Sequence, residues 1–354
     1  MKKFVVKIIL FSWPIAFLYL FTLGFYATDK GDLIRIGYLI DKGDYRNVFR
    51  KELDRKIFYT KVSSINLKSP KKYTVLTIGD SFSEQFGFGY KNYLAQKENL
   101  SILHLDRFLS DNPIQTLYGL LNSNVLDKIK VNYIILQSVE REFVIRGKNI
   151  DVSKIISINS LEKRIKKNNC SNSINKLKNE KNKYKFPSNR IIKFPLQNIF
   201  YLFDDNAYHS DCYKVKTKEN LFSGKSNNLL FLSTDLSNVK VNNDLKATTL
   251  LNDELNDLSK KLTLRGIKLI VLPSPDKFDL YYDYIIDNKK YPRPLFFENF
   301  EKLPKTYLYI NSKKMLKKQM KNQKDIYFYD DTHWSPWASK MIANELERVI
   351  RKKQ

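Results

Sequence analysis

Short apolar runs alternate with amphipathic segments along most of the chain. Four runs are typical of strands, at residues 73–78, 101–105, 133–139 and 267–272. The run at 133–139 is almost continuously apolar, as expected of a strand buried on both faces of a parallel sheet. Apolar residues at helical spacing separate these runs, at residues 114–129, 250–264 and 338–349. Strands that alternate with helices predict an α/β fold with a mainly parallel central sheet.

The last helix has a clear start signal. Ser335 followed by Pro336 is a favourable pair for an N-cap and a first helical turn. Just before it, residues 325–329 are a candidate for one more short strand.

The N-terminus has the pattern of a membrane anchor. Residues 4–26 form a 23-residue stretch whose only charge is Lys7. At about 1.5 Å per residue, this stretch spans a hydrocarbon core, and the basic residues before it keep the N-terminus in the cytoplasm. The exit from the stretch has bulky aromatic residues where a cleavage site has small ones, which favours an uncleaved signal anchor over a cleaved signal peptide. We expect a single-pass protein of the cytoplasmic (inner) membrane, with residues 73–354 on the periplasmic side.

Composition divides the rest of the chain into three parts. We expect a juxtamembrane stalk over residues 27–72 and a catalytic domain over residues 73–354. Within that domain, residues 159–190 are dominated by Lys, Asn and Ser, which predicts an exposed basic insertion, helical in part.

The net charge is +25, of which residues 1–30 contribute +3 and the rest of the chain +22. This excess fits either a solvated Lys-rich surface or attraction to an anionic partner. No nucleic-acid partner is expected, because no helix-turn-helix, zinc-finger or RNP motif accompanies the charge. Cys170 and Cys212 are compatible with one disulfide or with two free thiols. Neither has a second Cys or His at ligand spacing, so no metal site is predicted, and no cofactor.

Two segments far apart in the chain carry residues for nucleophilic catalysis. Ser81 follows the strand at 73–78, which places its hydroxyl at the carboxyl edge of the sheet, where α/β proteins build their sites. Gly79 permits a tight turn there, and a helix N-terminus at Ser81 would favour an oxyanion. Of the three histidines, only His333 has carboxylates closely before it, with Asp330 three residues and Asp331 two residues earlier. A histidine base held by a carboxylate is what a serine nucleophile requires.

These segments resemble a known superfamily. Residues 79–82 (Gly-Asp-Ser-Phe) resemble the first block of SGNH (GDSL) hydrolases, and Asp330 with His333 resembles the last block. Residues 331–334 (Asp-Thr-His-Trp) also resemble the Asp-x-His-Trp signature of alginate O-acetyltransferase-like proteins. Residues 139–141 and 275–281 resemble the Glu-Arg and Pro-Asp-Lys-x-x-x-Tyr elements of that subgroup.

The resemblance implies a flavodoxin-like three-layer SGNH fold and a serine acyl-enzyme. It also implies acetylation of an exported polysaccharide, with acetyl groups delivered by a multi-pass membrane O-acyltransferase partner. The chain departs from the alginate-type order, in which the Asp-x-His-Trp segment precedes the serine block. Asp330 has the usual SGNH spacing to His333 and Asp331 the alginate-type spacing, and we lean slightly to Asp330 as the orienting carboxylate.

Other residues have candidate roles. Arg141, Lys277 and Trp334 are candidates for substrate binding. The alternatives are a salt bridge of Arg141 with Glu140 at a strand end, pairing of Lys277 with Asp276, and packing of Trp334 under the last helix. The Ser81 N–H is expected to hold the oxyanion, and the candidates for a second donor are Asn112, Gln137 and Arg141.

The sequence thus predicts an enzyme, an SGNH-type serine acyltransferase or esterase. The favoured function is O-acetylation of an exported or cell-surface polysaccharide. The first alternative is a surface carbohydrate esterase that removes acetyl groups, and the second is a non-catalytic glycan-binding or assembly factor.

Overall fold

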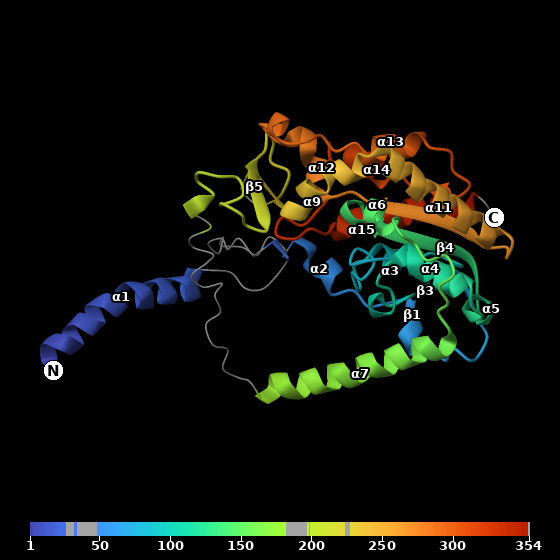
Figure 1. Ribbon diagram of the computed structural model, residues 1–354, viewed down its shortest axis with the longest axis horizontal. Coiled ribbons are helices and arrows are strands. Elements are labelled where there is room, and N and C mark those ends of the chain that lie inside the picture. The colour runs from blue at the N-terminus through green and yellow to red at the C-terminus, as the bar shows by residue number, and fades with distance from the viewer. Residues whose placement is uncertain (26–31, 34–47, 182–196, 198, 224–226, 353–354) are drawn as a thin grey trace.

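A computed structural model describes residues 1–25, 32–33, 48–181, 197, 199–223 and 227–352 (Figure 1). Its core is a six-stranded, entirely parallel sheet in the order β1-β3-β2-β4-β7-β8. The strands are β1 (Thr60–Lys61), β2 (Lys71–Ile78), β3 (Ile102–His104), β4 (Ile129–Val139), β7 (Lys268–Ser274) and β8 (Leu308–Tyr309). The four predicted strands are confirmed, and β4 extends four residues before the predicted run.

Helices cover both faces of this sheet, which gives three layers (Figure 1). One face packs against α3 (Tyr90–Ala95), α12 (Lys277–Tyr281), α14 (Ser312–Gln319) and α15 (Pro336–Arg351). The other packs against α4 (Pro113–Leu121), α5 (Val125–Lys128), α6 (Glu140–Arg146), α11 (Leu245–Thr263) and α13 (Phe296–Lys302). Adjacent residues of β4 alternate between the faces, Ile135 facing the first and Ile134 the second. The predicted α/β architecture is confirmed.

The strand order fixes where a site can form. Without the short edge strand β1, the order is 2-1-3-4-5, the flavodoxin-like arrangement. The chain leaves β2 towards β3 on one side, and β4 returns to the other side of β2. Ligands of such sheets bind at this reversal, outside the carboxyl ends of the strands. Here those ends are Ile78 of β2 and Val139 of β4.

Two predicted elements differ from the structure. The helix expected over 114–129 is divided into α4 and α5 by residues 122–124. The strand expected over 325–329 does not form, and Tyr327 makes only an isolated bridge with Trp334. The N-cap at Ser335 is confirmed, because its side chain accepts the Trp337 N–H at 3.2 Å.

Smaller elements lie outside the central sheet. Strands β5 (Cys212–Lys216) and β6 (Asn228–Leu232) form an antiparallel pair. The basic insertion begins with a long helix, α7 (Ile158–Lys181), and its residues 182–190 lie outside the described part of the chain. The remaining short helices are α2 (Arg50–Leu53), α9 (Ser233–Ser237) and α10 (Val239–Asn242). Cys170 is exposed and Cys212 buried, and no disulfide joins these two described residues.

The expected anchor corresponds to α1 (Lys2–Phe25), which extends away from the sheet in Figure 1. Among the residues that the structure describes, no helix is both long enough and apolar enough to cross a membrane. Membrane anchoring therefore stays a prediction, and most of the expected stalk lies outside the described residues.

Candidate active site

The turn after β2 is packed too tightly for any residue but glycine at position 79. A Cβ atom on Gly79 would lie 2.2 Å from Ser83 Oγ and 2.5 Å from Gln137 Oε1. Gln137, on β4, accepts hydrogen bonds from the Asp80 N–H at 3.1 Å and from the Ser83 hydroxyl at 2.9 Å. The close approach therefore ties the serine-bearing turn to the neighbouring strand at the reversal of the sheet.

Asp80 reinforces the same connection from inside the protein. One carboxylate oxygen accepts the Phe82 N–H at 3.0 Å, and the other accepts the Val139 N–H and Arg146 Nη1, both at 2.7 Å. Burial alone would raise the pKa of Asp80, but Arg146 and the backbone N–H donors outweigh it and lower that pKa. Asp80 is therefore a buried, ionised support for the turn that carries Ser81.

Ser81 itself is half-buried, with a free backbone N–H. That N–H makes no hydrogen bond to any described residue, so it can bind an oxyanion. The helix N-terminus expected at Ser81 is absent, because residues 81–89 form turns and bends and α3 begins only at Tyr90. The prediction that a helix dipole at Ser81 helps to bind the oxyanion is therefore wrong.

The loop that carries His333 is held by a buried lysine. Nζ of Lys277 donates to the carbonyl oxygens of Phe328 and Tyr329, each at 2.7 Å, and of Asp331 at 3.3 Å. Burial lowers the pKa of Lys277 to about 8. The side chain is fully buried, so its ammonium group fixes the loop. The prediction that Lys277 binds substrate is not supported by this placement.

The two predicted catalytic segments meet across the fold. The ring of Phe82, the residue after Ser81, lies 4.7 Å from the His333 imidazole, centroid to centroid. Gln85 Nε2 donates to the Trp334 carbonyl at 2.9 Å, which joins the loops again. The Nε2 atom of His333 is buried and has no hydrogen-bond partner among the described residues. This nitrogen is the one that a catalytic histidine offers to a serine hydroxyl.

The opposite ring nitrogen is held by Asp331. His333 Nδ1 lies 2.6 Å from Asp331 Oδ1, which also accepts the His333 N–H at 3.0 Å. Our preference for Asp330 as the orienting carboxylate is wrong, because Asp331 is the residue bonded to Nδ1. Asp330 is buried one residue earlier in the loop, and its backbone carbonyl accepts the Leu33 N–H at 3.0 Å. Adjacent residues of an irregular loop point in different directions, and only the loop backbone decides which carboxylate faces the ring.

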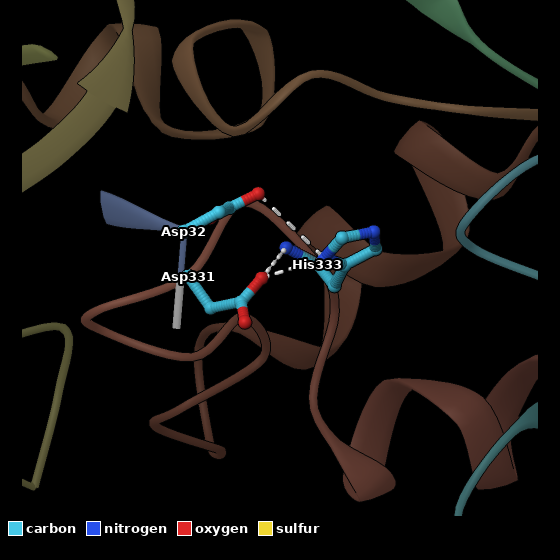
Figure 2. A group of neighbouring side chains, drawn as sticks. All are labelled: Asp32, Asp331 and His333. Carbon is cyan, nitrogen blue, oxygen red and sulfur yellow. Dashed lines mark hydrogen bonds and ion pairs between the residues drawn. The ribbon is translucent and has the colours of Figure 1, made fainter. Parts of the chain in front are cut away.

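A third carboxylate that the sequence analysis missed lies beside the pair. Asp32 Oδ2 is 3.9 Å from His333 Nδ1, and Figure 2 shows Asp32 and Asp331 on the same side of the ring, with the other ring nitrogen pointing away. Burial alone would lower the pKa of His333, but the bond to Asp331 and the charges of Asp331, Asp32 and Asp80 raise it above its ordinary value. No motif surrounds Asp32, so the sequence offered no signal for it.

The spacing of these three side chains would also allow a metal ion between them. Ligand atoms of Asp32, Asp331 and His333 lie within 4.8 Å of one another. The Nδ1 atom is already paired with Asp331 at hydrogen-bond distance, so the geometry is that of an oriented histidine base.

The remaining predicted residues have structural partners. Trp334 is fully buried against Phe82, 5.0 Å between ring centroids, and does not offer a surface for a sugar. Arg141, at the start of α6, pairs through Nη1 with two buried carboxylates, Asp235 at 3.0 Å and Asp276 at 2.8 Å. Its side chain is 11% exposed, so a structural salt bridge fits it best, although the partners are Asp235 and Asp276 and not the expected Glu140.

The candidates for a second oxyanion donor are also engaged. The amide nitrogen of Gln137 donates to Ser274 Oγ at 3.0 Å, and that of Asn112 donates to the Arg146 carbonyl at 2.8 Å while its oxygen caps α4. Nη1 of Arg141 is committed to its ion pairs. Of the predicted donors, the Ser81 N–H makes no hydrogen bond to any described residue.

The fold and the site have the features of an SGNH hydrolase-like protein. These features are a parallel sheet between two layers of helices, a serine after β2 and an Asp-x-His loop before the last helix. Residues 226–354 match the model of the family described as SGNH hydrolase-like domain, acetyltransferase AlgX, so this part of the chain is similar to that family. The predicted resemblance is confirmed. Comparisons with curated proteins and with solved structures gave no significant match.

The matched segment contains one half of the proposed chemistry. It includes Lys277, Asp331 and His333, whereas Ser81 and Arg141 precede it. The family match therefore supports an enzyme of acyl transfer or ester hydrolysis, and the assignment of Ser81 rests on the geometry of its turn.

Proposed function

We propose that the chain is a polysaccharide O-acetyltransferase that works through an acyl-enzyme on Ser81. The observation that carries this proposal is the buried Nε2 of His333, which has no partner among the residues that the structure describes, on a ring that packs against the residue next to Ser81. Asp331 fixes the opposite nitrogen as a donor, which leaves Nε2 as the proton acceptor.

The first half of the reaction forms the acyl-enzyme. Ser81 Oγ attacks the acetyl carbonyl of the donor while His333 Nε2 takes the hydroxyl proton. The tetrahedral oxyanion is bound by the Ser81 N–H. When the intermediate collapses, the bond from the carbonyl carbon to the leaving group breaks, and His333 returns the proton to that group.

The second half transfers the acetyl group to a sugar. His333 removes the proton of a glycan hydroxyl, whose oxygen attacks the acetyl-serine. Collapse of this second tetrahedral intermediate breaks the ester to Ser81 and returns the proton to Oγ. Water in place of the sugar gives an esterase with the same residues, so the acceptor decides between the two functions.

The donor and the location complete the proposal. We infer that acetyl groups come from a multi-pass membrane O-acyltransferase and that α1 anchors the chain beside it. The apolar side chains described on α1 support this location, since Phe4, Leu10 and Phe11 are each at least 66% exposed. An exposed apolar helix finds in a bilayer the surroundings that its side chains require.

The full chain in detergent, given an activated acetyl ester with and without glycan acceptors, tests the proposal. We expect ester turnover that rises with the correct glycan and yields acetylated sugar, and a loss of about 10⁴-fold or more in Ser81→Ala and His333→Asn. The matched control, Ser237→Ala on the exposed surface of α9, should behave as wild type.

Two results would support other functions. Release of free acetate at a rate that no acceptor changes would favour the carbohydrate esterase. Full complementation of a deletion strain by Ser81→Ala would end the catalytic proposal and favour a non-catalytic glycan-binding factor.

A further inference from the structure

Asp32 clamps the residue between the two members of the histidine–carboxylate pair. Its Oδ1 accepts the Thr332 N–H at 2.7 Å, and its Oδ2 accepts the Thr332 hydroxyl. Thr332 is fully buried and stands directly between Asp331 and His333 in the chain. Because Thr332 donates one hydrogen bond from its backbone and one from its side chain to the same carboxylate, both parts of Thr332 are fixed.

Leu33 secures the same segment on the other side of Asp331. Its N–H donates to the Asp330 carbonyl at 3.0 Å, and its side chain is fully buried with Cys212 and Leu230. The Asp32–Leu33 pair therefore bonds to the residues on both sides of Asp331, some 300 positions away in the sequence. Such bracketing restricts the turn that aims the imidazole.

We propose that Asp32 is a positioning residue for His333: it holds the Asp331–His333 turn in register and places a second negative charge beside Nδ1. The proposal rests on the proposed function, in which His333 is the base. It assigns part of the active site to the segment that follows α1, outside the family match at residues 226–354.

The charges around the ring determine the sign of the effect. Asp331 is bonded to Nδ1, Asp32 lies 3.9 Å from it, and Asp80 also acts on the ring from the serine-bearing turn. All three stabilise the imidazolium, against burial, which destabilises it. The buried cation Lys277 also interacts with Asp32 and Asp331, and its positive charge partly offsets the stabilisation that these carboxylates give the imidazolium.

The protonation of Asp32 itself sets the lowest pH at which it can support the His333 imidazolium. Burial and repulsion by Asp331 raise the pKa of Asp32, while His333 and the bonds from Thr332 lower it, and the net shift is upward. As the pH falls through this raised pKa, Asp32 becomes neutral and its support for the imidazolium is lost.

Two substitutions separate charge from position. Asp32→Asn removes the charge but keeps an oxygen for the Thr332 N–H and an amide for its hydroxyl. Asp32→Ala removes both the charge and the clamp. If Asp32 acted only as structural filler, Asp32→Asn would leave the ionisation of His333 unchanged.

The direct measurement is an NMR titration of the histidine Cε1–Hε1 signals in the full chain. The chain has three histidines, so His333→Asn identifies the signal of interest. In a Ser81→Ala background we expect Asp32→Asn to lower the pKa of His333 by about one unit or more, because one charge at about 4 Å has at least this effect in water and a larger one in a partly buried site. Asp253→Asn, an exposed aspartate on α11, is the control and should leave it unchanged.

Kinetics provide the second readout. In chains with Ser81 intact, Asp32→Asn should move the acid limb of the kcat/KM profile to lower pH, and Asp32→Ala should also lower kcat by about tenfold or more through misorientation of the base. An unshifted His333 pKa in Asp32→Asn would overturn the proposal. If the proposal of an acyl-enzyme on Ser81 is wrong, Ser81→Ala will keep full activity. The titration would still decide the role of Asp32 in that case.

Discussion

At the scale of single residues, the site depends on buried charges that have fixed partners. Asp80 joins the end of β2 to the end of β4 and pairs with Arg146 at 2.7 Å. Removal of one member of such a pair leaves the other charge buried without compensation, which costs far more than an exposed ion pair is worth.

We expect Asp80→Asn to lower the free energy of unfolding by about 3–5 kcal/mol at pH 7. Because the folded-state pKa of Asp80 is lowered, its stabilisation is present above the unfolded pKa and is lost as the pH falls through the folded value. Urea denaturation at pH 7 and in acid, below that folded value, measures the difference, which should shrink in acid. An equal loss at both pH values would show that shape, not ionisation, gives Asp80 its effect.

The residue scale also shows what sequence reasoning could reach. Ser81 and His333 stood out because each lies in a motif with a known chemical purpose. The choice between Asp330 and Asp331 required the loop backbone, since both are adjacent in sequence and only Asp331 faces the ring. Lys277 and Trp334 were candidates for substrate binding, but both are buried, Lys277 beneath the loop that carries the base and Trp334 within the core, as the packing alternative had it.

At the scale of elements, strands were predicted well because a buried parallel strand imposes continuous apolar character. Local polar bonds explain the divided helix at 114–129. Asn122 donates to the carbonyls of Val152 and Lys154, and Ser123 Oγ accepts the Val125 N–H at 3.3 Å. Such bonds compete with the helical pattern, and apolar spacing does not register them.

The turn after β2 allows a test with two glycines. Gly79→Ala would push a Cβ into Ser83 and Gln137, so we expect catalytic turnover to fall by about tenfold or more through displacement of Ser81. Gly266→Ala is the matched control: its φ of +73° makes alanine strained there, but nothing lies within 4 Å. It should cost about 1 kcal/mol of stability with activity unchanged. Ester turnover alongside thermal unfolding distinguishes the two, and equal activity losses would contradict this account.

At the scale of the whole molecule, the site is assembled from three distant parts of the chain: 32–33, 79–85 and 330–334. The sequence predicted two of them. The third could not be predicted, because a lone Asp in a short stalk has no periodicity or motif around it, and its role exists only through the fold.

Truncation tests this assembly. A chain that starts at residue 27 loses α1 but keeps Asp32 and Leu33, whereas a chain that starts at residue 48 loses both. We expect ester turnover of the first to equal that of the full chain and that of the second to fall at least as far as in Asp32→Ala. Comparison of kcat for the two truncated chains measures this, and equal values would mean that the catalytic loop is self-sufficient.

The attachment of Asp32 to the catalytic loop also limits how far the chemistry can lie from a lipid surface. Only seven peptide units separate Phe25, the last residue of α1, from Asp32. Even a fully stretched backbone covers at most about 25 Å over that span. If α1 lies in a bilayer and the proposed O-acetyltransferase function holds, the active site would therefore act on polymer close to the membrane and to a donor in it, and would not reach strands farther out in the envelope.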